Sequence, residues 1–173
     1  MKQQEMLAEM VLSGRDLFVR YLAGFDDSTH TRIAPGCPNH VAWCLGHCAL
    51  VMYRFAEKLD GMPLPASDFV VADLGDPQRF GTESVAFGSA PKLDASAFPT
   101  FARCQQIFSD ATVRLARWVA GATTEQLERN TVFFPRFEAP AWRVVPRVVF
   151  HSGHHCGQVA DLRRALGMKS IFA

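Results

Sequence analysis

The chain has 173 residues, of which 49% are hydrophobic and 20% are charged, as is usual for one compact globular domain with a full core. Its 18 Lys and Arg residues nearly balance its 17 Asp and Glu residues, giving a formal charge of +1. Because a nucleic-acid-binding surface normally shows a strong basic excess, this balance gives no indication of a nucleic-acid partner.

Targeting and membrane-spanning patterns are also missing from the sequence. The polar start, residues 1–6, has no apolar signal core or small-residue cleavage site, and no apolar run reaches the about 18 residues of a membrane helix. The cysteines lack the paired spacings of a zinc ribbon or a secreted disulfide scaffold; they are Cys37, Cys44, Cys48, Cys104 and Cys156. We therefore expect a cytoplasmic protein with reduced thiols and no membrane partner.

Two segments predict the first two helices. From Gln4 to about Leu22, apolar residues recur at three- and four-residue steps, as in an amphipathic helix. The second segment, from about His40 to Leu59, follows a turn at Pro38 and Asn39 that predicts an N-cap. It is apolar around most of its circumference in its first half, so its first turns should be buried. We expect His40, at the very start of this helix, to be exposed.

A connection of about 35 residues follows, from Gly61 to about Ala95, and it is interrupted by repeated Pro and Gly residues. Loops of this length are uncommon inside a compact domain and are usually functional or covering. Phe69, Phe80 and Phe87 argue against disorder, so we expect them to pack over the body of the domain. The length also allows a crossover, so the helices that it joins need not be antiparallel neighbours.

The second half of the chain predicts two further helices. The third helix should run from Ser96, as its cap, to Val119, with Pro99 in its first turn. The last should start between Trp142 and Pro146 and end at Leu166, before Gly167.

Between the third and last helices, residues 123–127 predict a capped short turn. An extended aromatic segment, residues 130–142, should then cover one end of the helices. Four helices with one long crossover predict an all-α four-helix bundle, which we expect to form a single domain over residues 1–173.

The last predicted helix carries the pattern that most directly predicts a functional site. His151 and His155 are four residues apart, so their imidazoles lie on the same helix face and can aim at one point. A metal ion is the natural occupant of that point. His154 is rotated by roughly 100° from its neighbour, which places it at the rim of such a site.

A third ligand is needed, because a catalytic zinc is usually held by three protein ligands. His47 is the best placed, since it lies in the apolar run 41–52, where a polar side chain requires a partner. The alternative is a core histidine that donates to a backbone carbonyl. Cys44 and Cys48 lie on the same side of the predicted helix and could serve as soft ligands, but we expect them to act as small core residues.

The motifs on these two helices resemble the DinB-like superfamily. They are Gly46-His47 preceded by Trp43, and His151-x-x-His154-His155-x-Gly157-Gln158. The similarity covers these helices closely and the rest of the chain by helix length and loop placement. Where relatives often carry Glu-Ala, this chain has Ser152-Gly153. A glycine inside a helix costs roughly 1 kcal/mol against alanine, so we expect close packing at Gly153.

The resemblance implies an up-down-down-up bundle, usually a homodimer, with a divalent ion such as zinc or nickel held by three histidines in an open cavity. Carried over to this sequence, the ligands are His47, His151 and His155. Characterised relatives include transferases that use bacillithiol and isomerases that use mycothiol to act on maleylpyruvate.

Our leading hypothesis is a metal-dependent transferase or isomerase acting on a small molecule, in which a low-molecular-weight thiol binds the open coordination position as thiolate. Two alternatives stay open: a non-catalytic metal-binding or stress-response protein, and a metal-dependent hydrolase. The sequence identifies neither a catalytic base nor a substrate pocket. We interpret Gln158 as a helix-face amide and Arg163 as a cation favourable to the end of the helix dipole.

Overall fold

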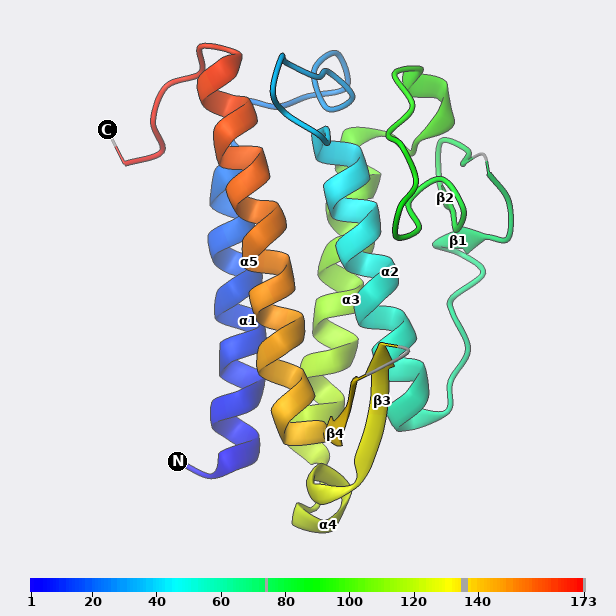
Figure 1. Ribbon diagram of the computed structural model, residues 1–173, viewed down its shortest axis with the longest axis vertical. Coiled ribbons are helices and arrows are strands. Elements are labelled where there is room, and N and C mark those ends of the chain that lie inside the picture. Colours follow the sequence, from blue (N-terminus) through cyan, green and yellow to red (C-terminus); the bar gives the residue numbers. More distant parts are fainter. Residues whose placement is uncertain (74, 135–136, 173) are drawn as a thin grey trace.

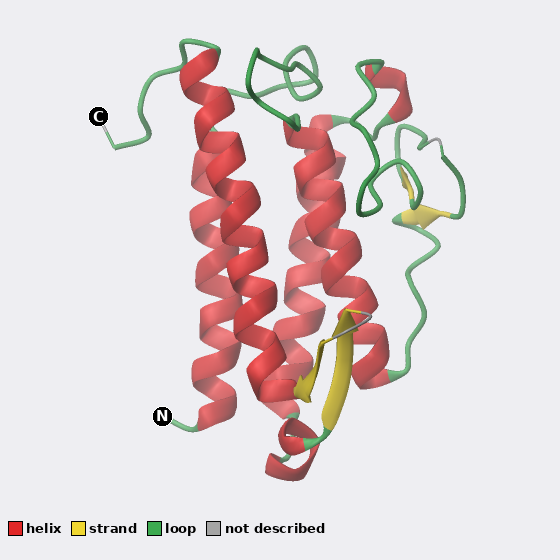
Figure 2. Cartoon of the chain, in the orientation of Figure 1, coloured by secondary structure: helices red, strands yellow, loops and turns green. Residues whose placement is uncertain are grey.

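The structure is a computed structural model that describes residues 1–73, 75–134 and 137–172, and in these residues four long helices lie side by side (Figures 1 and 2). The helices are α1 (Gln3–Tyr21), α2 (Val41–Asp60), α3 (Phe101–Gly121) and α5 (Ala141–Ala165). α1 packs against α3 and α5, and α2 packs against the same two helices. The predicted all-α class is therefore confirmed.

Figure 1 shows α1 and α5 running up the page while α2 and α3 run down. Because α2 and α3 point the same way, the connection between them must return along the outside of the bundle. It contains two short parallel strands, β1 (Phe69–Val70) and β2 (Phe80–Gly81), and a 3-10 helix, η1 (Ala95–Ala97). The length of this connection had indicated such a crossover.

The core lies between the four helices, where apolar side chains at three- and four-residue steps face inward. Phe18 of α1 and Phe108 of α3 are both fully buried and meet edge to face with ring centroids 5.0 Å apart. Arg114 of α3 binds both carboxylate oxygens of Asp60, at 2.9 and 2.7 Å, and so fastens α3 to the end of α2. Within the described part of the chain, no helix has the length and apolar character needed to cross a membrane.

The crossover packs over the body as predicted for two of its three aromatic residues. Phe69 and Phe80 are buried, but Phe87 is 90% exposed, so the prediction was wrong there. Phe69 and Phe80 are paired across β1 and β2 and face the core, whereas Phe87 lies in a turn beyond them.

Two helix starts differ from the sequence prediction. α3 begins at Phe101 with Thr100 as its cap, not at Ser96. Phe98 is extended because the residue before a proline avoids helical angles, so Pro99 separates η1 from α3. α5 begins at Ala141, which places Pro146 in its second turn rather than its first, where it removes one backbone hydrogen bond.

The segment between α3 and α5 forms more regular structure than predicted. α4 (Thr124–Glu128) has the expected capping box, made by Thr123 and Gln126. The aromatic segment pairs with itself as an antiparallel hairpin of β3 (Asn130–Phe134) and β4 (Phe137–Pro140), with residues 135 and 136 outside the described part. The hairpin lies beside the lower ends of α2 and α5 (Figure 1), which agrees with the predicted cover.

Two charged or titratable residues near helix ends are buried: Arg163, which lies in the last turn of α5 as expected, and His40, the N-cap of α2. Arg163 is 7% exposed and donates to the backbone carbonyls of Tyr21, Ala23 and Lys169, so it holds the end of α1 and the C-terminal segment. His40 is fully buried, and the prediction of an exposed residue was wrong.

His40 joins the start of α2 to the crossover. Its Nδ1 accepts from the Trp43 backbone N–H at 3.1 Å as the N-cap of α2, which leaves Nε2 to donate to the Lys92 carbonyl at 2.9 Å. Its ring also meets Phe98 edge to face, with centroids 4.8 Å apart. Burial lowers the pKa of His40 to about 4, so the ring is neutral at pH 7.

Replacing His40 with Ala removes the cap and the bond to Lys92 and leaves a space in the core. We expect the unfolding free energy, measured with denaturant, to fall by about 2–3 kcal/mol. His40→Asn should lose less, because Asn is itself a good N-cap. An unfolding free energy unchanged in His40→Ala would contradict this role.

The same variants have a second readout in the pH dependence of stability. Between about pH 4 and 6.5 the unfolded chain binds a proton at His40 that the folded chain does not bind, so the unfolding free energy decreases as the pH falls through this window. The decrease should be smaller in His40→Asn than in the wild type.

Candidate metal centre

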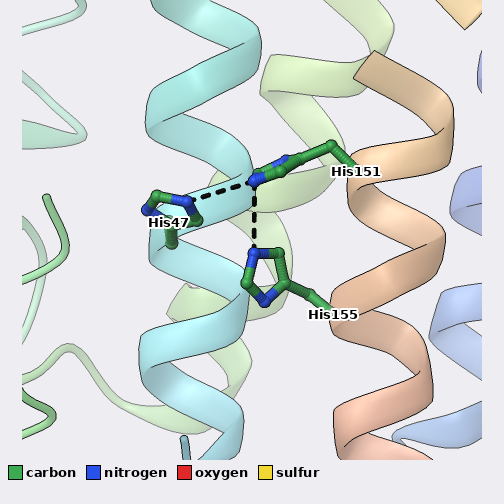
Figure 3. Close-up of side chains that lie close together, drawn as sticks. All are labelled: His47, His151 and His155. Carbon is green, nitrogen blue, oxygen red and sulfur yellow. Dashed lines mark hydrogen bonds between the residues drawn. The ribbon is translucent and has the colours of Figure 1, made fainter. Parts of the chain in front are cut away.

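Three histidines from two helices meet between α2 and α5 (Figure 3). His47 comes from α2, and His151 and His155 come from successive turns of α5. The Nε2 atom of His151 lies 3.2 Å from Nε2 of His47 and 3.2 Å from Nε2 of His155. One nitrogen from each ring lies within 4.8 Å of the other two. The structure thus brings together the three residues that the sequence predicts as metal ligands.

The bond that His47 makes on its far side fixes which nitrogen faces the cluster. Its Nδ1 lies 2.8 Å from the Val85 backbone oxygen, which can only accept, so Nδ1 carries the hydrogen and Nε2 keeps its lone pair. His47 therefore donates to a backbone carbonyl, as the alternative interpretation expected, and it also turns a free nitrogen toward His151.

Gln158 orients His155 in the same way. The Nδ1 atom of His155 donates to Gln158 Oε1 at 2.8 Å, and Asn39 Nδ2 donates to the same oxygen at 3.0 Å. The amide nitrogen of Gln158 lies 3.4 Å from His154 Nε2. The interpretation of Gln158 as a plain helix-face amide was thus wrong. Its three-residue spacing from His155 was the one signal in the sequence for this contact.

Trp43 forms a wall of the cluster. Its ring stacks on His47 with centroids 4.6 Å apart and planes 12° from parallel, and it meets His155 at 5.6 Å. The indole N–H donates to Ser89 Oγ at 2.9 Å, which ties this wall to the crossover. Each ring of the cluster that contacts Trp43 is consequently restricted in its rotation.

The three rings are neutral at pH 7. Burial lowers the pKa of His47, and it lowers the pKa of His155 to about 4. The pKa of His151 is lowered to about 3 by burial and by the neighbouring His155 and His47. Because the rings are neutral, no imidazolium has to lose a proton before a cation binds.

The donor set fits a divalent ion. His47 and His155 both present lone pairs to His151 Nε2, which carries at most one hydrogen and can complete one full hydrogen bond. The buried Nδ1 of His151 has no hydrogen-bond partner among the described residues. With its hydrogen on Nδ1, His151 would turn a third lone pair inward, and a cation would satisfy all three nitrogens. Imidazole nitrogens suit zinc, nickel, copper and iron.

A cavity of about 320 Å³, named here the triad cavity, opens beside the cluster. It is lined by Asn39, Trp43, His47, Phe87, Gly88, Ser89, His151, His154 and His155. His154 is exposed at the rim, as the helical rotation predicts. Cys44 and Cys48 are fully buried and lie outside the histidine cluster, and burial raises the pKa of both thiols. A small molecule can reach the histidines through this cavity.

Gly46 allows the crossover to approach the cluster. A Cβ atom at this position would lie 2.6 Å from the Phe80 ring and 2.9 Å from the Val85 side chain, closer than such atoms can pack. The absence of a side chain therefore lets the crossover lie against α2, where the Val85 carbonyl reaches His47. At Gly153 a Cβ would meet nothing within 4 Å, so the expected close packing there was wrong.

Comparisons with known proteins agree with this architecture. A family model described as the DinB superfamily matches residues 11–159. The crystal structure of the conserved protein of locus from Enterococcus faecalis is similar, with a TM-score of 0.68 and 12% identity, and the match covers 95% of this chain and 97% of that chain. At this identity the likeness shows the fold alone. No curated protein sequence matches the chain.

Gly46→Ala should separate the crossover from α2 and weaken the bond between His47 and Val85. We expect the unfolding free energy to fall by about 1–3 kcal/mol, as for other overpacked positions. Gly153→Ala is the matched control, because it adds the same methyl group to open space in a helix and should stabilise the protein by up to about 1 kcal/mol. Denaturant unfolding compares the two, and equal effects would contradict the role of Gly46.

Proposed function

The chain belongs to the DinB superfamily, and we propose that it binds one divalent metal ion through His47, His151 and His155. The observation that carries the proposal is the convergence of the three Nε2 atoms, two of them on rings whose hydrogens are held on Nδ1 by Val85 and Gln158. Of the ions that imidazole nitrogens suit, we propose zinc and nickel, the two that the resemblance to the DinB-like superfamily implies.

We further propose that the protein is a transferase or isomerase that uses a low-molecular-weight thiol. When bound, an ion with three protein ligands keeps a coordination position open, where it can lower the pKa of a thiol or water and polarise a carbonyl. The residues of the chain would supply the setting for this chemistry. Val85 and Gln158 hold the rings in place, Trp43 shields His47 and His155 on one side, and the triad cavity admits small molecules.

A homodimer is also part of the proposal. Apolar side chains that a second copy could cover include Phe150 of α5, which is 78% exposed, and Met6 and Leu17 of α1, which are 51% and 47% exposed.

Metal titration of single variants tests the ligand set. His47→Ala, His151→Ala and His155→Ala should each weaken metal binding by about 100-fold or more, since each removes one of three ligands. Gln158→Leu should weaken it by about 10–100-fold, as expected for a residue that orients a ligand.

His154→Ala is the control, because it removes a neighbouring imidazole of α5 that lies at the rim. It should change metal affinity much less than the three ligand variants. Buried His30 and His40 are poor controls, because both bind backbone carbonyls and their loss would disturb the fold. If His154→Ala lost more affinity than His151→Ala, the proposed ligand set would be incorrect.

The proposed chemistry is tested by following the consumption of an electrophile, such as 1-chloro-2,4-dinitrobenzene or maleylpyruvate, with and without bacillithiol, mycothiol or glutathione. We expect turnover that requires both metal and thiol and that is lost in His151→Ala. Hydrolysis of a nitrophenyl ester without thiol would instead indicate a hydrolase. Full metal occupancy without turnover of any of these compounds would contradict the enzymatic proposal and favour a metal-binding protein.

A further inference from the structure

A second cavity, of about 210 Å³, lies further along α2 and is named here the apolar cavity. It is lined by His47, Leu50, Val51, Arg54, Phe55, Lys58, Ala86, Phe87 and Phe133. The residues come from α2, from the crossover and from β3. Because His47 and Phe87 also line the triad cavity, the two cavities share a boundary and one molecule could occupy both.

The α2 residues that line the apolar cavity change in character along the helix. His47, Val51, Arg54 and Lys58 follow one another at steps of three and four residues and therefore lie on one face of the helix. At a rise of 1.5 Å per residue, Arg54 lies about 10 Å and Lys58 about 16 Å along the axis from His47. The face thus leads from a proposed metal ligand, past an apolar stretch, to two cations.

Neither cation is fully neutralised. Arg54 pairs with Glu57 at 2.9 Å, but its side chain is 50% exposed, so solvent screens this pair. Lys58 donates to the Val132 backbone carbonyl at 2.7 Å and contacts no carboxylate among the described residues. The described residues that line the apolar cavity include no Asp or Glu. The far end of this cavity is consequently positive.

The rest of the lining is apolar. Phe55 and Phe133 meet edge to face with ring centroids 5.5 Å apart, and Leu50, Val51 and Ala86 complete the wall. Phe87, at the boundary of the two cavities, is 90% exposed. A ligand that covered this ring would remove a large apolar surface from water.

We propose that the apolar cavity binds the non-reacting end of the substrate, which is an apolar body that ends in a carboxylate. The carboxylate would lie against Arg54 and Lys58, the apolar body against Val51, Phe55 and Phe87, and the reacting group beside His47. The assignment to a substrate rests on the proposed function, but recognition of the carboxylate requires only the apolar cavity and its cations.

The test is calorimetric titration with 4-phenylbutanoate and with its uncharged counterpart, 4-phenylbutanamide. Chelator-treated protein is used, so that the carboxylate cannot bind a metal ion. We expect the carboxylate to bind about 5–10-fold more tightly than the amide, as for a partly exposed ion pair. Arg54→Gln and Lys58→Gln should each remove most of this preference, because they weaken binding of the carboxylate much more than binding of the amide.

Two further variants sharpen the result. Glu57→Gln should increase the preference for the carboxylate, because it frees Arg54 from its partner. Arg117→Gln, which neutralises an exposed arginine of α3 away from the cavity, is the matched control and should have no effect. Equal binding of carboxylate and amide, or a preference that survives in both Arg54→Gln and Lys58→Gln, would overturn the inference.

Metal titration of the same preparations separates this inference from the proposed function. Metal binding without any carboxylate preference would overturn the apolar cavity as a carboxylate site and leave the metal centre intact. A carboxylate preference without metal binding would support the cavity and contradict the proposed function.

Discussion

The bond from His47 to the Val85 carbonyl is the interaction on which the rest of the site depends. It exists because Gly46 lets the crossover lie against α2, and it determines that His47 turns a lone pair toward α5. The crossover in turn supplies Phe87, Gly88 and Ser89 to the triad cavity. A connection that serves only to join α2 to α3 needs no such contact, so its length has a structural purpose beyond the crossover.

Bringing three neutral histidines together in a partly buried cluster costs free energy. Burial disfavours their charged forms, and three inward lone pairs repel one another unless a cation or a hydrogen lies between them. The surrounding contacts offset this cost by holding each polar group: Gln158 accepts from His155, Asn39 supports Gln158, and Trp43 stacks on His47. Such prior orientation is what a metal site requires, since rings that must first turn inward bind an ion more weakly.

Periodicity in the sequence was enough to predict the four long helices and the meeting of His151 with His155, because both follow from the spacing of residues on a helix. His47 was found because it is a polar residue in an apolar run. The carbonyl of Val85 carries no sequence signal, since every residue has one. His40 was misjudged for a related reason: its burial depends on Lys92 and Phe98, which are more than fifty positions away and meet it only in the folded chain.

The two cavities together explain why one face of α2 carries both a proposed metal ligand and two cations. An α-helix keeps a constant rise per residue, so His47 and Arg54 remain a fixed distance apart, which a loop would not ensure. A substrate held at one end by charge would then present its other end to the same point each time. α5 contributes the remaining two imidazoles but no residue to the apolar cavity. The proposed ligand recognition and the proposed metal binding would therefore be altered separately, by changes on α2 beyond His47 or by changes on α5.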